Sequence, residues 1–258
     1  MEFFMSQVND GYKIHALPLC TVDDFPRSHL HWMLPVPFDV RVRDCHYVWY
    51  IEGLGDKYLI DAGISAERFV AKKRKSTHIQ TLDEALGGVG LEVGDIDYVI
   101  VSHAHHDHIA NLRCFPKAKA IIQRAELEEA HEPFHYSRPR LPTDYADLLM
   151  GIRWEVVEGD TRIDDNVELL FTPGHSAGGQ SVAVKTSKGL AVVTGFCCQQ
   201  ENFDPPDEFK KMGYPFTICH SHINPVALYD STKRLTEMAD IIIPCHEYEK
   251  LVGTTCIG

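Results

Sequence analysis

Four histidines and one aspartate follow an apolar run in the segment Ser102-His-Ala-His-His-Asp-His108. Imidazole nitrogens and carboxylate oxygens are ligands that suit zinc, iron and manganese. A short loop can turn the alternating His103 and His105 toward one point, and Asp107 and His108 toward a second. The segment therefore predicts a metal site at the end of a strand.

Two further histidines stand just after apolar runs. His175 lies in the turn Phe171-Thr-Pro-Gly-His175-Ser, and His246 follows Ile241-Ile-Ile-Pro-Cys. A solvated, histidine-rich loop is the competing interpretation of any one of these segments. Three strand ends that together supply six residues of ligand type favour a shared metal centre instead.

The order of these motifs, HxHxDH, then TPGHS, then a late strand-end histidine, resembles the metallo-β-lactamase superfamily from about Tyr47 to His246. Within the superfamily, the segments SHAHHDHIANLRCFPKAKAIIQRAELEEA and TPGHSAGGQSV look most like N-acyl homoserine lactone lactonases. The resemblance implies an α/β fold, a four-layer αβ/βα sandwich. We expect residues 1–258 to form a single domain of this kind.

The resemblance also implies roles for individual residues. It assigns a first metal ion to His103, His105 and His175, and a second ion to Asp107, His108 and His246. Asp61, in Tyr58-Leu-Ile-Asp-Ala-Gly63, matches a strand-end aspartate that hydrogen-bonds to the metal ligands and fixes their orientation. A simple turn residue before Gly63 is the alternative interpretation of Asp61.

One position departs from the family pattern. Members of the resembled family usually carry Gly-Asp after the strand that follows the TPGH motif, and this aspartate bridges two metal ions. In this sequence Gly195 is followed by Phe196 instead. The thiolate of Cys197 or Cys198 could replace this ligand, which would favour zinc, although small buried cysteines are common in cores. One or two zinc ions are expected, with iron or manganese as alternatives.

Other residues near the motifs remain open in role. Gln199 and Gln200 occupy the stretch where the resembled lactonases carry a substrate-contacting tyrosine. His220 and His222 have the spacing of a metal pair and could line the pocket. Polar surface residues are the alternative interpretation of both.

The metal centre predicts hydrolysis of an acyl bond. A metal ion lowers the pKa of bound water from about 15.7 to about 7 and can polarise a carbonyl. We expect a lactone or related ester as the substrate, with Asp107 orienting the nucleophile or carrying its proton to the leaving oxygen. A thioesterase of glyoxalase II type, a mononuclear iron oxygenase and a non-catalytic metal-dependent binding module are the alternatives.

Composition narrows the partners. The formal net charge of -12 argues against nucleic acid, whose phosphates attract clustered Lys and Arg. The start lacks a basic segment followed by an apolar one, and no apolar run is long enough to span a membrane. The eight cysteines show no disulfide or CxxC spacing. We expect a cytoplasmic protein that acts on a small molecule.

The elements that must position the motifs alternate along the chain, which is typical of an α/β domain. Apolar and β-branched runs predict strands at Tyr47–Ile51, Lys57–Ile60, Tyr98–Val101, Lys119–Gln123, Val167–Phe171, Ser181–Val184, Leu190–Val193 and Ile241–Ile243. Helix formers predict helices at Thr81–Leu86, Arg124–His131, Thr143–Met150 and Pro225–Met238. Asp23–Asp44, with three prolines, is predicted as a long loop that serves a substrate pocket or a homodimer contact.

Overall fold

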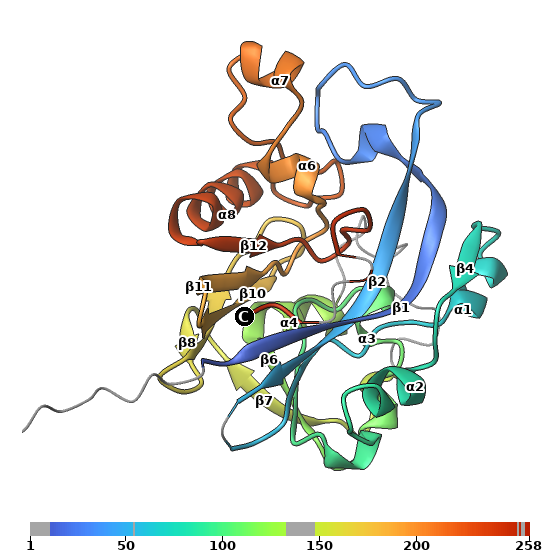
Figure 1. The fold of residues 1–258 in the computed structure, drawn as a ribbon, viewed down its shortest axis with the longest axis vertical. Coiled ribbons are helices and arrows are strands. Elements are labelled where there is room, and N and C mark those ends of the chain that lie inside the picture. The colour runs from blue at the N-terminus through green and yellow to red at the C-terminus, as the bar shows by residue number, and fades with distance from the viewer. Residues whose placement is uncertain (1–10, 54, 133–147, 252, 254–255) are drawn as a thin grey trace, which may run out of the picture.

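Two β-sheets with helices on their outer faces make up the computed structural model (Figure 1), which describes residues 11–53, 55–132, 148–251, 253 and 256–258. The larger sheet has the strand order β4 (Ser76–His78), β1 (Lys13–Pro26), β2 (Arg41–Glu52), β3 (Tyr58–Ile60), β5 (Tyr98–Ile100), β6 (Lys119–Gln123) and β7 (Arg153–Val157). The smaller sheet has the order β12 (Ile241–Ile243), β11 (Gly189–Val193), β10 (Gln180–Thr186), β9 (Val167–Phe171) and β8 (Thr161–Arg162).

The described helices are mostly short. They are α1 (Ala66–Ala71), α2 (Leu82–Gly87), α3 (His106–Ile109), α4 (Arg124–His131), α6 (Gln200–Phe203), α7 (Asp207–Lys211) and α8 (Pro225–Met238), with single 3-10 turns at Arg27–His29, Val93–Asp95 and Leu112–Cys114. None of these helices is long and apolar enough to cross a membrane.

Alternation of side chains along the strands creates three apolar layers. On β2, Trp49 packs into the core between the two sheets, whereas its neighbour Val48 packs into the core that contains residues of α2 and α4. On β11, Val193 faces the same inter-sheet core, and Val192 packs against Leu228 of α8. Because successive strand residues point to opposite faces, these layers confirm the predicted four-layer arrangement of helix, sheet, sheet and helix.

The predicted elements largely match the observed ones. All eight predicted strands overlap observed strands, and α4 and α8 have the predicted bounds. Thr81 caps α2, because its side chain accepts from the backbone N–H of Glu84 while Glu84 accepts from the backbone N–H of Thr81. The helix predicted at Thr143–Met150 falls largely outside the described residues.

The prediction of a long loop from Asp23 to Asp44 is wrong at both ends. β1 continues to Pro26 and β2 begins at Arg41, and the two strands pair antiparallel, with Phe25 opposite Val42. No strand is predicted from the sequence anywhere in β1 either. Its pattern is irregular because the pairing with β2 shifts register near Pro18, where proline cannot donate a ladder hydrogen bond.

One edge of the larger sheet collects the residues that could do chemistry. β3, β5 and β6 run parallel, so their carboxyl ends meet at the same edge. β2 is antiparallel to β3, with Trp49 opposite Ile60, so the beginning of β2 reaches that edge as well. The smaller sheet contributes the residues that follow β9 and β12. The strand order thus brings together segments that are far apart in the sequence.

Candidate metal centre

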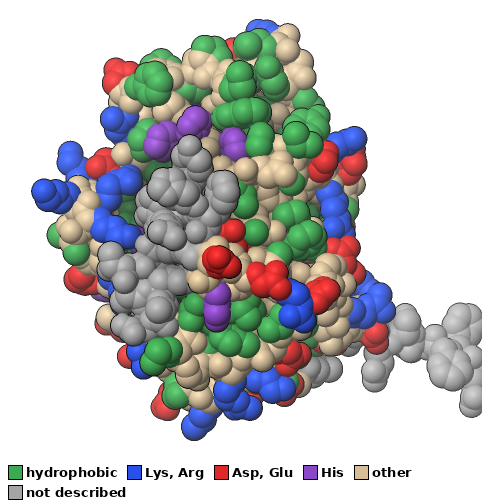
Figure 2. Space-filling model, turned by 180° about the vertical axis from the view of Figure 1, so that it is seen from behind, with side chains coloured by type: hydrophobic (Ala, Val, Ile, Leu, Met, Phe, Trp, Pro, Cys, Tyr) green, Lys and Arg blue, Asp and Glu red, His purple; other side chains and the backbone are tan. Residues whose placement is uncertain are grey.

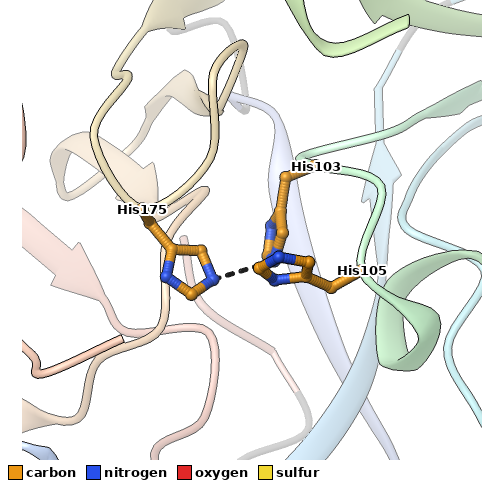
Figure 3. Close-up of side chains that lie close together, drawn as sticks. All are labelled: His103, His105 and His175. Carbon is orange, nitrogen blue, oxygen red and sulfur yellow. Dashed lines mark hydrogen bonds between the residues drawn. The ribbon is translucent and has the colours of Figure 1, made fainter. Parts of the chain in front are cut away.

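Three histidine rings converge at the centre of this edge. One ligand atom from each of His103, His105 and His175 lies within 4.8 Å of the others, and all three side chains are buried. The Nε2 atoms of His103 and His175 are 3.2 Å apart. Figure 3 shows the rings pointing toward one another from two separate segments of the chain. The structure thus brings the predicted first ligand set together.

The tautomer of His175 shows what these rings can hold. Its Nδ1 donates a hydrogen bond to the carbonyl oxygen of Ser221, which leaves a lone pair on the Nε2 that faces His103. Burial, together with the neighbouring histidines, lowers the pKa of His103 well below its usual range. The lowered pKa keeps His103 in its neutral form, and the converging imidazole nitrogens form a site for a cation, so the donor set fits a metal ion.

Backbone geometry at the turn before His175 depends on glycine. Gly174 has a φ of +126°, a region that residues with a side chain rarely adopt. A Cβ atom there would also lie 2.2 Å from the backbone nitrogen of Leu228, near the start of α8. The Thr-Pro-Gly-His sequence therefore places His175 by letting the turn pack directly against a helix.

A second group contains Asp107, His108 and His246, whose ligand atoms also lie within 4.8 Å of one another. The Oδ2 of Asp107 is 3.3 Å from Nε2 of His108 and 3.5 Å from Nε2 of His246. His246 donates from Nδ1 to the carbonyl oxygen of Cys45 at 3.1 Å, which directs its Nε2 into the group. The predicted second set is thus assembled too.

Asp61 occupies the position that its strand-end motif predicts. Its carboxylate accepts hydrogen bonds from the backbone N–H and the hydroxyl of Ser102, both at 2.8 Å, and from Nδ1 of His108 at 2.6 Å. Asp61 has a φ of +60°, a left-handed conformation that aspartate tolerates better than most residues. Asp61 therefore aims the Nε2 atom of His108 toward Asp107.

The electrostatics of this group favour positive charge. Burial alone would lower the pKa of His108, but the carboxylates of Asp107 and Asp61 outweigh it and raise the pKa well above its usual range. Burial would raise the pKa of Asp107, but His108, with help from His46, holds it well below its usual range. The carboxylates therefore stabilise a cation in a buried place, which is what a metal ion needs.

A third group, Asp44, His46 and His246, was not foreseen. The ligand atoms of these buried residues again lie within 4.8 Å of one another. Asp44 and His46 fall in the segment around the start of β2, and two-residue spacing puts both on the same face of the strand. The Asp-x-His spacing next to an apolar run is the sequence feature that could have predicted this group.

Glu126 on α4 is a further residue that sequence reasoning missed. Its buried carboxylate accepts from the backbone N–H of Ala104, between two of the ligand histidines, and from that of Gly178, both at 2.7 Å. Burial raises the pKa of Glu126, although these two N–H groups oppose the shift. Glu126 thereby ties the His103 segment to the His175 turn.

Phe196 and the two cysteines that follow it have different surroundings. Phe196 packs in the core with Phe203, at a ring-centroid distance of 6.3 Å, and is 2% exposed. Cys197 lines the cavity described below, and the Cys198 sulfur lies 3.0 Å from the Thr194 hydroxyl. Among the described residues, the three groups that could hold a metal contain no cysteine.

The remaining open residues lie outside those groups. His220 is exposed and stacks on His29 with ring centroids 5.8 Å apart, while His222 packs edge-on against Trp32. Gln199 donates a hydrogen bond to the carbonyl oxygen of Arg43. Within the part of the chain that the structure describes, His220, His222 and Gln199 belong to none of the three groups that could hold a metal.

A cavity of about 340 Å³ opens above the three groups, and its lining includes Asp44, His46, His105, Asp107, His175 and His246. Val22, Phe25 and Phe69 add apolar wall, and Lys72 and Arg74 add positive charge. Figure 2 shows exposed histidine side chains on one face of the molecule, below a group of hydrophobic side chains, whereas the histidines of the three groups are buried. The volume suits a small organic ligand.

Comparisons with known proteins find similarity to lactonases. An N-acyl homoserine lactonase of Bacillus cereus is 34% identical over 151 residues, which are 58% of this chain and 57% of the relative, so the match spans less than two thirds of that relative. A quorum-quenching N-acyl homoserine lactone lactonase of solved structure is 26% identical, covers 95% of each chain and has a TM-score of 0.71.

A more distant solved structure, the dizinc quorum-quenching lactonase AidC, shares the fold with a TM-score of 0.64 at 14% identity, over 94% of this chain and 86% of that one. The model of the metallo-beta-lactamase superfamily matches residues 43–195, more than half of the chain. The strand-end ligand groups lie largely within this range, and the chain belongs to the metallo-beta-lactamase superfamily.

Proposed function

We propose that this protein is a metal-dependent hydrolase that opens the ring of an N-acyl homoserine lactone or a closely related ester. The convergence of His103, His105 and His175 beneath a cavity carries the proposal. The names of the Bacillus cereus relative and of the 26%-identical structure support this substrate class over a thioester or an oxygenase substrate.

Zinc is the metal that we propose. The first ion would be held by His103, His105 and His175, and Asp107, His108 and His246 would contribute to a second. Imidazole and carboxylate ligands suit zinc, and the structural neighbour AidC is named as a dizinc enzyme. Asp61 would keep His108 in the tautomer that ligates through Nε2.

When bound, the metal would supply a nucleophile at neutral pH, by lowering the pKa of water, and would polarise the substrate carbonyl. The new bond joins the water oxygen to the carbonyl carbon, and the ring C–O bond breaks to give a hydroxy acid. Asp107 is held ionised and lines the cavity, so it can accept the proton of the attacking water and deliver it to the departing ring oxygen.

Different walls of the cavity would bind the apolar and the polar parts of such a substrate. The apolar side chains of Val22, Phe25 and Phe69 suit an acyl chain, whose burial stabilises the complex by about 25 cal/mol per Å². Lys72 and Arg74 would face the amide or carboxylate oxygens of substrate and product.

The test is a hydrolysis screen on zinc-loaded protein with matched lactones, acyclic esters and thioesters, followed by dialysis against a chelator. We expect ring opening of acyl homoserine lactones, detected as acid release, and loss of activity on chelation with recovery when zinc is restored. Thioesters cleaved in preference to lactones would favour a glyoxalase II-like enzyme. Metal binding without turnover of any substrate would favour a binding module.

We also propose a cytoplasmic location. All eight cysteines are free thiols and six of them are buried, which suits a reducing compartment. Fractionation of host cells tests the location. Recovery of the protein outside the cytoplasmic fraction would contradict it.

A further inference from the structure

A buried carboxylate and a buried imidazole stand side by side at the start of β2, outside the ligand sets that the sequence motifs assign. Asp44 is 5% exposed and His46 is 3% exposed. Both line the cavity, together with His246 from the opposite sheet. An ionised carboxylate is costly to bury unless it is paired with a cation or hydrogen-bonded.

The two ring nitrogens of His46 make no hydrogen bond with any residue that the structure describes, although both are buried. Its Nε2 lies 3.6 Å from Oδ2 of Asp44, and its Nδ1 lies 3.4 Å from Oδ2 of Asp107. Charge-assisted hydrogen bonds are shorter, about 2.7–2.9 Å. Buried nitrogens without partners are rare in native proteins and need an explanation.

These separations suit ligands of one metal ion. Two atoms bound about 2.1 Å from a tetrahedral ion lie about 3.4 Å apart. The ligand atoms of Asp44, His46 and His246 lie within 4.8 Å of one another, and the Nε2 of His246 is left available by its Nδ1 hydrogen bond to Cys45. The spacing therefore allows an ion between the three side chains.

The Asp44 carboxylate is also held in place. Gln199 bonds through Nε2 to the carbonyl oxygen of Arg43 at 2.7 Å and to Oδ1 of Asp44 at 3.3 Å. The other oxygen, Oδ2, is thereby left to face His46. Such outer contacts orient ligands in metal sites.

Asp44 lies where it can replace the carboxylate that is missing at position 196. Phe196 is packed in the core and supplies no carboxylate, so His246 lacks the strand-end acid on its own sheet. The antiparallel pairing of β2 with β3 brings the start of β2 to the same edge, where Asp44 enters from the larger sheet.

We propose that Asp44 and His46 add to His246, Asp107 and His108 as ligands of the second metal ion, and that Asp44 supplies the carboxylate missing at position 196. The inference deepens the metal centre of the proposed function, but it does not depend on a lactone substrate.

The test counts metal ions. Protein stripped of metal is reloaded with zinc, passed through a desalting column and analysed by mass spectrometry for zinc per chain. We expect about two ions in the unchanged protein and about one in Asp44→Asn and in His46→Gln. His15→Gln is the matched control, because His15 pairs with Glu52 at 2.7 Å in the same sheet but does not line the cavity. It should retain about two ions.

Cobalt supplies a second measurement. The visible absorption of cobalt-loaded protein should saturate in two steps for the unchanged protein and in one step for either variant, with the first step unaltered. Circular dichroism checks folding, and if His46→Gln does not fold, Asp44→Asn decides alone. Equal metal content in the unchanged protein and both variants, or a single ion in the unchanged protein, overturns the proposal. Because neither readout uses substrate, inactivity toward lactones would overturn only the proposed function.

Discussion

The Oδ2 atom of Asp61 lies 2.6 Å from Nδ1 of His108, although 47 residues separate them in the sequence. The contact fixes which nitrogen of His108 is free to ligate. It exists because β3 and β5 run parallel, so the residues after each strand meet at one edge.

Asp61→Ala should weaken metal binding by about 10–100-fold, because His108 loses the acceptor that orients its ring. Competition with a zinc-binding dye measures the affinity. Asp97→Asn is the control: this exposed carboxylate accepts from the backbone N–H of Lys57 and does not line the cavity. An affinity unchanged in Asp61→Ala would show that the ring is held without it.

His103→Ala and His175→Ala should each remove activity and most of the metal from the first site, since each takes away one of three converging nitrogens. Zinc analysis and hydrolysis rates are the measurements. His131→Ala should change neither, because His131 is exposed at the end of α4 and its Nδ1 bonds to the carbonyl oxygen of Leu127 in the same helix. Equal losses in all three variants would contradict the ligand assignment.

Glu126→Ala should destabilise the fold by about 1–3 kcal/mol, because it leaves the buried N–H groups of Ala104 and Gly178 without an acceptor. It should also weaken metal binding, since both loops carry ligand histidines. Urea unfolding with and without zinc measures the two effects. Glu128→Ala, at an exposed position of the same helix, should alter neither. A loss of stability without any loss of metal affinity would limit Glu126 to a structural role.

Glu201 should make stability depend on pH. Burial alone would raise its pKa, but His31 at 2.6 Å and Arg27 at 2.8 Å outweigh burial and lower the pKa below 4.5 in the fold. The ionised carboxylate therefore stabilises the protein above pH 4.5, and this contribution is lost as the pH falls through the lowered pKa.

Glu201→Gln should accordingly lower the free energy of unfolding at neutral pH and make its decline in acid shallower. Urea unfolding at a series of pH values measures both. Glu208→Gln, at an exposed position of α7, should leave the profile unchanged. A profile for Glu201→Gln that parallels that of the unchanged protein would mean that the pair contributes nothing.

The sequence by itself determined the residues whose chemistry lies in local motifs. The HxHxDH segment, the TPGH turn and His246 each follow an apolar run, and the end of a strand is visible in one dimension because apolar periodicity stops there. The helices and strands could be predicted because apolar periodicity is also a local property of the sequence. The long loop expected from Asp23 to Asp44 was wrong because strand pairing, which is not local, extends β1 and β2 into it.

Only the tertiary structure decided which residues of different strands share the metal centre. Asp44 and His46 join His246 because β2 is antiparallel to β3, and Glu126 joins two ligand loops because α4 packs beneath both. Phe196 stands where the family resemblance predicts a ligand, yet its ring lies in the core while Cys197 faces the cavity. Direction and burial of a side chain depend on how the sheets pack, and spacing along the chain does not specify that packing.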